Sequence, residues 1–165
     1  MEFRDATVDD LPVIAAIFLR CWTISYASVL SENARASFTP ESAEQLWRTS
    51  IESPGDKQTL LLLDDEKIVG VFRIGSDKDD ASRGHLFSLY VDPESAGRGF
   101  GKKALQEAKD RIAERCFTQM TLWVFADNEI ANSLYLKSGF TPTGKSRTTP
   151  EWAALEIELM ASLNV

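Results

Sequence analysis

The chain has 165 residues, of which 44% are hydrophobic and 26% charged, and its formal net charge is −7 at pH 7. This length and composition are typical of one globular domain, so we expect a single domain over residues 1–165. The negative charge argues against binding of nucleic acid or of an anionic membrane surface, and it mildly favours a cationic partner.

No targeting or membrane-spanning pattern is visible. The chain begins Met-Glu-Phe-Arg-Asp, without the apolar run of a signal peptide, and no segment approaches the ~18 apolar residues that cross a bilayer. Cys21 and Cys116 both lie in apolar patterns, where reduced core cysteines are commoner than disulfides or metal ligands. We therefore expect a cytoplasmic protein without a metal site.

The first half of the chain predicts two helices followed by a hairpin. Residues 3–6 indicate a short strand, and Thr7 begins a helix whose apolar positions continue to Trp22. Residues 28–38 predict a loop or a short helix. Thr39 and Pro40 begin the next helix. Residues 58–63 and 68–76 predict two paired strands, and residues 77–84 a charged surface turn. The second helix should bury the stripe Ala43, Leu46, Trp47 and Ile51.

The second half alternates strands and helices. Residues 85–91 and 119–125 predict strands, residues 128–138 a helix that Gly139 caps, and residues 140–148 and 152–160 a closing hairpin. The order of elements indicates one α/β layer structure. Between the two strands lies another helix with a predicted apolar face of Ala104, Leu105, Ala108, Ile112 and Cys116.

A glycine-rich loop connects the strand at 85–91 to that helix, with glycines at positions 97, 99 and 101. Glycines let backbone N–H groups converge on an anion, and a helix start adds unpaired N–H groups and the positive end of its dipole. A phosphate-binding loop is predicted, although such a turn can also be geometry alone. Two other phosphate-binding loops are excluded by their spacing. A Walker loop requires glycine at position 96 and Ser or Thr at position 103, where this chain has Ala96 and Lys103. A dinucleotide-binding fingerprint requires Gly or Ala at position 102, where this chain has Lys102.

The remaining pattern, Gly97-Arg98-Gly99-Phe100-Gly101 after Tyr-Val-Asp-Pro, resembles the pyrophosphate loop of the GNAT superfamily of acetyl-CoA-dependent N-acyltransferases. That loop reads Gln/Arg-x-x-Gly-x-Gly/Ala, and this chain departs from it at Ala96. Residues 122–140 resemble a second family segment, Leu-x-Val…Asn-x-x-Ala-x-x-Leu/Phe-Tyr-x-x-x-Gly-Phe. The order of elements is also the family's. The resemblance therefore covers nearly the whole chain and implies an α/β fold with a mixed sheet of about seven strands flanked by about four helices.

The resemblance implies acetyl-CoA as the cofactor. In the family the loop binds the pyrophosphate mostly through backbone N–H groups, the end of the preceding strand pairs with the carbonyl and pantetheine, and a helix residue contacts the pantetheine arm. The corresponding helix residue is Asn128, which could also be a helix N-cap. The other cofactor-binding positions are Leu89, Tyr90, Val91, Gly97, Arg98, Gly99, Phe100, Gly101 and Lys102.

The resemblance also implies direct acetyl transfer without a covalent enzyme intermediate. A primary amine has a pKa of about 10.4, so a base must accept its proton near neutral pH. In the family the tyrosine at position 135 protonates the departing thiolate, although Tyr135 could also be a half-buried core aromatic. Many members carry Glu where this chain has His85, its one histidine. Its ordinary pKa suits a base, yet an isolated histidine at a strand start is often a solvated edge residue.

We expect the acceptor to be a primary amine of a small molecule. The first two helices and the last hairpin turn flank the acceptor in the family, which makes Trp22, Tyr26 and Trp152 candidates for its pocket, whereas Trp47 keeps core spacing. Ribosomal-protein N-terminal acetyltransferases carry Glu where this chain has Trp123, which disfavours a peptide N-terminus. A non-catalytic coenzyme A-binding or sensory domain and a protein or peptide amine acetyltransferase stay open as alternatives, as does a homodimer.

Overall fold

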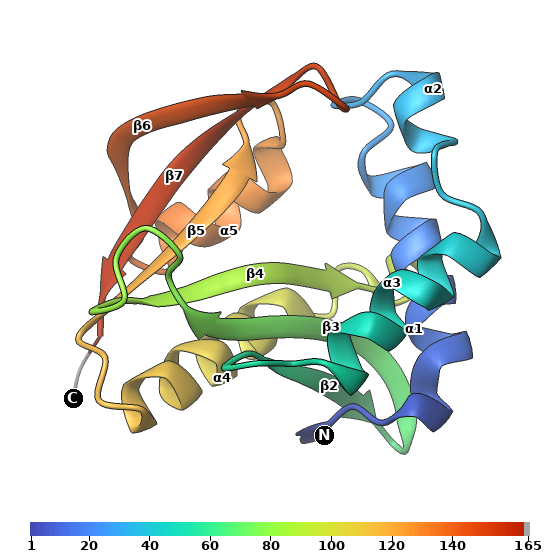
Figure 1. Cartoon of the computed structure of the whole chain (residues 1–165), viewed down its shortest axis with the longest axis horizontal. Coiled ribbons are helices and arrows are strands. Elements are labelled where there is room, and N and C mark those ends of the chain that lie inside the picture. The colour runs from blue at the N-terminus through green and yellow to red at the C-terminus, as the bar shows by residue number, and fades with distance from the viewer. Residues whose placement is uncertain (164–165) are drawn as a thin grey trace.

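The computed structural model describes residues 1–163, which fold around one mixed sheet of seven strands (Figure 1). The strand order is β1-β2-β3-β4-β5-β7-β6, and every neighbouring pair is antiparallel except β4 and β5. The predicted seven-stranded mixed sheet is confirmed. Its strands are β1 (Glu2–Asp5), β2 (Gln58–Asp64), β3 (Lys67–Ser76), β4 (Gly84–Val91), β5 (Gln119–Phe125), β6 (Thr141–Thr149) and β7 (Ala154–Ser162).

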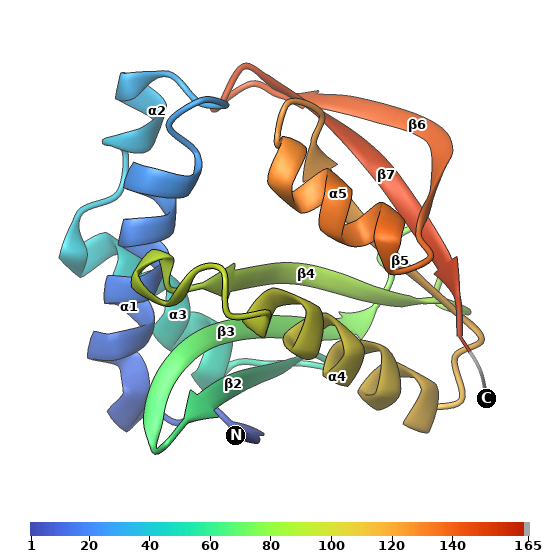
Figure 2. The ribbon, with the colours of Figure 1, turned by 180° about the vertical axis from the view of Figure 1, so that it is seen from behind.

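Helices cover both faces of the sheet, α1 and α3 on one face and α4 and α5 on the other (Figures 1 and 2). The described residues form five α-helices rather than about four, because the segment 28–38 contains the one-turn helix α2. The helices are α1 (Leu11–Arg20), α2 (Glu32–Arg35), α3 (Pro40–Glu52), α4 (Phe100–Glu114) and α5 (Glu129–Lys137).

Strand β2 carries four consecutive leucines, Leu60–Leu63, because both of its faces are buried. In β2, Leu60 and Leu62 pack towards α4, whereas Leu61 and Leu63 pack towards α1 and α3. Successive side chains of a strand point to opposite faces, so this unbroken run of leucines supplies both cores. Trp47 of α3 is buried with the second pair, as its spacing predicts.

Three expectations about burial were wrong. Leu46 is 45% exposed, because the buried stripe of α3 continues from Trp47 to Ser50, whose hydroxyl donates to the Leu46 carbonyl. Cys116 is exposed because the chain turns there with φ +65° after α4 ends, although Cys21 is buried and both thiols are free. Asp77 is buried rather than part of a surface turn, since its carboxylate accepts from the Thr121 hydroxyl.

The sheet opens between β4 and β5. These strands pair only where Gly84–Leu86 meets Met120–Leu122, and beyond that point they diverge (Figure 1). This splay leaves one edge of β4 facing a gap in the sheet. Within residues 1–163, no helix combines the length and apolarity that crossing a membrane requires.

Candidate active site

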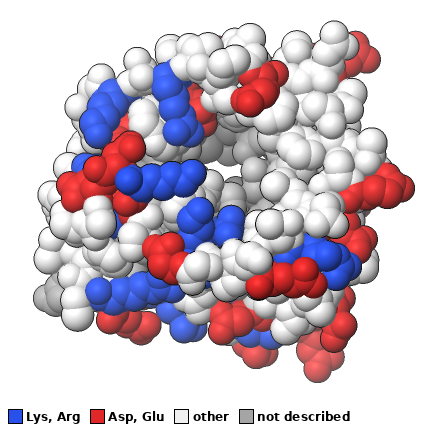
Figure 3. Space-filling model, in the orientation of Figure 1, with Lys and Arg blue, Asp and Glu red and all other residues white. Residues whose placement is uncertain are grey.

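A cavity of about 1060 Å³ opens where β4 and β5 diverge. Its walls come from the splayed strand ends, the glycine loop before α4, α5, the turn after α1 and the turn between β6 and β7. The space-filling view shows a hollow in the face presented in Figure 3, with charged side chains of both signs around it. Ligand sites usually measure ~300–1,000 Å³, so this cavity has room for a long ligand and a second, small one.

The glycine loop forms one end of the cavity with its backbone exposed. Gly97 and Gly99 both have φ +77°, and a Cβ added to either would meet nothing within 4 Å. Gly99 is the N-cap of α4, whose first turn carries Lys102 and Lys103 and no acidic residue. Cations at a helix N-terminus oppose the helix dipole. Their presence beside unpaired N–H groups fits a bound phosphate anion, as the predicted loop requires.

The end of β4 forms the floor of the cavity. Leu89, Tyr90 and Val91 all line it, and within residues 1–163 no strand pairs with this edge of β4 beyond Leu86. The Val91 carbonyl accepts from the Cys21 thiol at 3.2 Å. A free strand edge offers alternating N–H and C=O groups to an extended ligand, which is the contact that the amide-rich pantetheine arm of coenzyme A can make.

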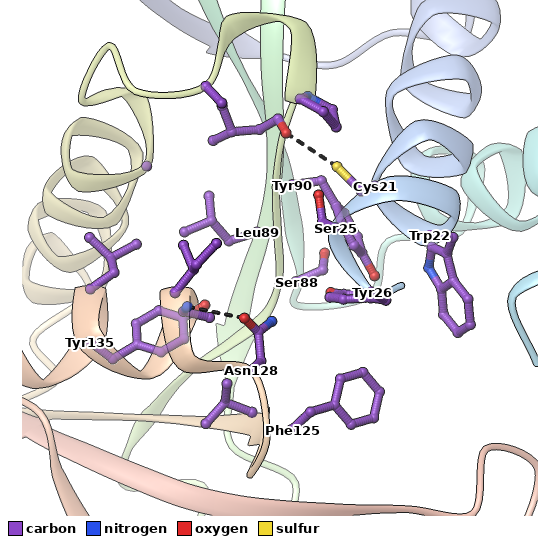
Figure 4. A pocket seen from close by; sticks show the side chains of 18 of the residues that line it. Cys21, Trp22, Ser25, Tyr26, Ser88, Leu89, Tyr90, Phe125, Asn128 and Tyr135 are labelled. Carbon is purple, nitrogen blue, oxygen red and sulfur yellow. Dashed lines mark hydrogen bonds between the residues drawn. The ribbon is translucent and has the colours of Figure 1, made fainter. Parts of the chain in front are cut away.

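Helix α5 places Asn128 and Tyr135 on one side of β4, opposite Trp22 and Tyr26 (Figure 4). Asn128 is the N-cap of α5, because its Oδ1 accepts from the Ala131 backbone N–H at 3.1 Å. Tyr135 is 8% exposed, and burial raises the pKa of its phenol well above the ordinary value. Tyr135 therefore carries its proton throughout the neutral pH range.

Aromatic side chains form the other end of the cavity. Helix α1 continues into a π-helical turn over Cys21–Ser25, which brings Trp22 and Tyr26 to the cavity wall. The ring centroid of Trp22 lies 4.8 Å from that of Trp152, and that of Tyr26 lies 5.4 Å from that of Phe125. The three predicted acceptor-pocket residues are thus brought together from segments that lie far apart in the sequence, and Phe125 joins them.

Two predicted residues do not line the cavity. The Arg98 guanidinium points away to the β2–β3 hairpin, where it lies 2.7 Å from the Asp64 carboxylate. His85 is buried at the closed end of the β4–β5 pair, with Nδ1 2.7 Å from the Thr121 hydroxyl. Burial lowers the pKa of His85 to about 4. His85 is therefore neither a solvated edge residue nor a base that faces the cavity.

The Thr121 hydroxyl also fixes the tautomer of His85. Its one proton goes to the Asp77 carboxylate, 2.6 Å away, and an ionised carboxylate can only accept. The bond between Thr121 and His85 must then use a proton on the histidine Nδ1. Arg83 completes this cluster with a 3.1 Å ion pair to Asp77. The histidine thus belongs to a buried polar network that fastens the 77–84 turn to the sheet.

Glu156 of β7 lines the aromatic end of the cavity, and sequence reasoning missed it. Its side chain is 13% exposed, and its Oε2 accepts from Arg147 Nε and from the Thr149 hydroxyl, each at 2.8 Å. Among the lining residues that the structure describes, Glu156 supplies the only carboxylate and Lys102 the only ammonium group. The alternation of Glu156 and Glu158 with apolar neighbours puts both on one face of β7, but does not show that this face lines a cavity.

Known acetyltransferases are similar to the chain along most of its length. Residues 15–140 match the Acetyltransferase (GNAT) family. A spermidine N(1)-acetyltransferase from Thermoplasma acidophilum is 27% identical over 144 residues, which are 85% of this chain and 88% of that protein. The PaiA N-acetyltransferase of T. acidophilum, solved with coenzyme A, has a TM-score of 0.73 at 24% identity and covers 95% of this chain and 96% of its own. YncA from Salmonella typhimurium, solved with acetyl-CoA, has a TM-score of 0.73 at 18% identity, with coverages of 100% and 95%.

Proposed function

The chain belongs to the Acetyltransferase (GNAT) family and is an acetyl-CoA-dependent acyltransferase, and from this premise we propose that it acetylates a primary amine of a small molecule. One observation carries the proposal. A single cavity runs from an exposed glycine backbone at the start of α4 to an aromatic end lined by Trp22, Tyr26 and Trp152. Such a cavity can hold donor and acceptor together, as direct transfer in a ternary complex requires.

We assign donor binding to backbone groups along one side of the cavity. The N–H groups around Gly97, Gly99 and Gly101, with the Lys102 ammonium, would hold the pyrophosphate. The free edge of β4 at Leu89–Val91 would pair with the pantetheine arm, and Asn128 would contact that arm with the side-chain amide nitrogen that its capping bond leaves unused. Bound acetyl-CoA supplies the acetyl group as a reactive thioester.

Tyr135 is our candidate for the general acid. Its phenol stays protonated because it is buried, and the residue lines the cavity between the glycine loop and the aromatic end. Because the phenol is protonated, it can hydrogen-bond to the sulfur and donate its proton as the C–S bond breaks, and the proton that the amine loses would restore the phenol. We no longer assign the base to His85, because its side chain does not line the cavity. We propose instead that water at the aromatic end accepts the proton of the attacking amine.

A small acceptor is favoured by the packed rings of the aromatic end. Trp152 lies within ring-contact distance of both Trp22 and Phe38, so the wall on the β6–β7 side is closed by packed rings. A relative that spans 85% of this chain is named for acetylation of spermidine, a small amine. Both observations support a free alkylamine rather than a protein side chain.

A thiol-release assay with acetyl-CoA and a panel of amines tests the proposal. We expect turnover with alkylamines and none without an acceptor. Thermal stabilisation by acetyl-CoA without turnover on any amine would instead favour a non-catalytic coenzyme A-binding domain. Turnover confined to peptides would favour the protein or peptide acetyltransferase.

A further inference from the structure

We propose that the Glu156 carboxylate binds a second, non-reacting ammonium group of the acceptor, so that the preferred acceptors are aliphatic diamines and polyamines. This inference rests on the proposed function, since it names the substrate class of the same cavity. It gives Glu156 a role in positioning and specificity and leaves the transfer itself to other groups.

The position of Glu156 directs its side chain into the acceptor end. In the β5–β7 pair Glu156 stands directly opposite Phe125. Cross-strand neighbours project from the same face of a sheet, so the carboxylate lies beside the ring that, with Tyr26, forms the aromatic end. Figure 4 shows Phe125 and Tyr26 facing the space across from Asn128 and Tyr135.

One oxygen of the carboxylate is engaged and the other is available. Arg147 and Thr149 both donate to Oε2, which fixes the orientation of the group. Within residues 1–163 no donor bonds to Oε1. An ionised carboxylate has about four lone-pair sites. Glu156 is therefore pre-oriented to accept further N–H bonds from a ligand in the cavity.

The pairing with Arg147 does not cancel the charge that a ligand would meet. The Arg147 side chain is 52% exposed and its guanidinium lies 4.3 Å from the centroid of the Trp123 ring, so water screens much of its charge. The carboxylate is only 13% exposed. From inside the cavity the negative group is the nearer and less screened of the two, and the lining ammonium of Lys102 belongs to the opposite, glycine-loop end.

A fixed carboxylate among aromatic rings suits a charge that persists through the reaction. The attacking nitrogen must be neutral, so it cannot keep an ion pair while it attacks. A second ammonium on the same molecule stays protonated at pH 7. The faces of Trp152, Trp22 and Tyr26 attract cations and pack against alkyl chains. Carboxylate and rings together therefore fit the far end of a diamine.

Calorimetric binding to the coenzyme A complex tests this inference without turnover. The protein is saturated with coenzyme A, which carries no acetyl group, and titrated at pH 7 with 1,3-diaminopropane, 1,4-diaminobutane or propylamine. We expect at least one diamine to bind the wild type about tenfold more tightly than propylamine, and Glu156→Gln to abolish that preference. Glu151→Gln removes an exposed carboxylate from the same hairpin and should retain it, which separates a contact from the loss of one charge.

The kinetic readout is a split between KM and kcat. In Glu156→Gln the KM for the diamine should rise about tenfold while kcat and the KM for propylamine stay near wild type. If Glu156→Gln proves unfolded, Glu156→Asp keeps the charge and shortens its reach, and it should retain part of the preference. Equal affinity of the wild type for the monoamine and both diamines, or an unchanged preference in Glu156→Gln, would overturn the inference. Absence of turnover on every amine would overturn the proposed function instead.

Discussion

The two ends of the cavity are built in opposite ways. The glycine end comes from one contiguous stretch, residues 97–102, and presents backbone N–H groups. The aromatic end assembles side chains from the turn after α1, from β5 and from the β6–β7 turn, so that Trp22 meets Trp152 across 130 residues of chain. A site that binds its ligand through backbone groups can be recognised in the sequence from a local motif. A site built from side chains of distant segments can be recognised only in the tertiary structure.

Tyr135→Phe should have the largest effect, because Tyr135 lies between the two ends and is proposed to act on the reacting atoms. The variant keeps the ring and removes one hydroxyl. We expect kcat to fall ~10²–10⁴-fold with acetyl-CoA affinity and melting temperature unchanged. Steady-state kinetics, calorimetry and thermal unfolding measure the three quantities. Tyr26→Phe removes the same atom on the acceptor side and should change kcat by only a few fold. Comparable losses in both variants, or a melted Tyr135→Phe protein, would refute the assignment.

Gly99→Asn should damage the glycine end alone. Asparagine tolerates the left-handed backbone at φ +77° better than other residues, yet its side chain would occupy the space offered to the phosphates. Loss of two charge-assisted hydrogen bonds should weaken acetyl-CoA binding about 10²–10³-fold in a calorimetric titration. Gly55→Asn is the matched control, because Gly55 has φ +61°, equally open surroundings and no part in the cavity. Equal acetyl-CoA affinity in the two variants would contradict the pyrophosphate assignment.

The difference between the backbone-built glycine end and the side-chain-built aromatic end also explains what the sequence could predict. The strands, the helices and the glycine loop follow from local periodicity, turn residues and one motif, and the structure contains all of them. Glu156 could not be found in this way, because its role depends on which face of β7 meets the cavity. His85 was misjudged for a related reason. The resemblance matched His85 to a position where many family members carry Glu, but β4 and β5 are still paired at His85 and Thr121.

The variant His85→Gln tests whether His85 is a buried structural residue, as its position indicates, or takes part at the acceptor end of the cavity. Unfolded His85 takes up a proton below about pH 6.5, whereas burial delays protonation of the folded state to about pH 4. Between those values the unfolded state binds more protons, so the free energy of unfolding should fall by about 3 kcal/mol as pH decreases. Urea unfolding from pH 7 to 4.5 should show a shallower decline in His85→Gln.

Enzyme activity supplies the control for that experiment. Between pH 6 and 8 the dependence of kcat on pH should have the same shape in wild type and His85→Gln, because the histidine does not line the cavity. Loss of the acidic limb of the activity profile in the variant would return the base role to His85. The lowered pKa of Asp77 affects stability only below its ordinary value of 3.8, outside the measured range.

The smallest predicted effect concerns the ion pair between Arg20 and Asp92, which joins the two ends. Arg20 ends α1 just before the turn that holds Trp22, and Asp92 directly follows β4, before the glycine loop. Arg20 Nε and Nη2 donate to the two carboxylate oxygens of Asp92 at 3.0 and 2.7 Å. Burial is the largest single influence on the pKa of Asp92 and would raise it, but the hydrogen bonds from Arg20 and from the Glu94 backbone N–H, together with the positive charges of Arg20 and Lys67, lower the pKa overall.

Arg20→Met should therefore leave an unpaired buried carboxylate, since the Asp92 side chain is 1% exposed. Breaking a fully buried pair costs about 3–5 kcal/mol. Because the Arg20 side chain is 33% exposed, we expect a smaller loss, about 2 kcal/mol in urea unfolding. Arg48→Met breaks exposed pairs on α3 and should cost less than about 0.5 kcal/mol. Adding Asp92→Asn to Arg20→Met should restore part of the lost stability, because the unpaired charge is removed.

If the two ends are coupled through this pair, Arg20→Met should weaken acetyl-CoA and acceptor binding together. A change confined to one ligand would show that each end is held in place by its own packing.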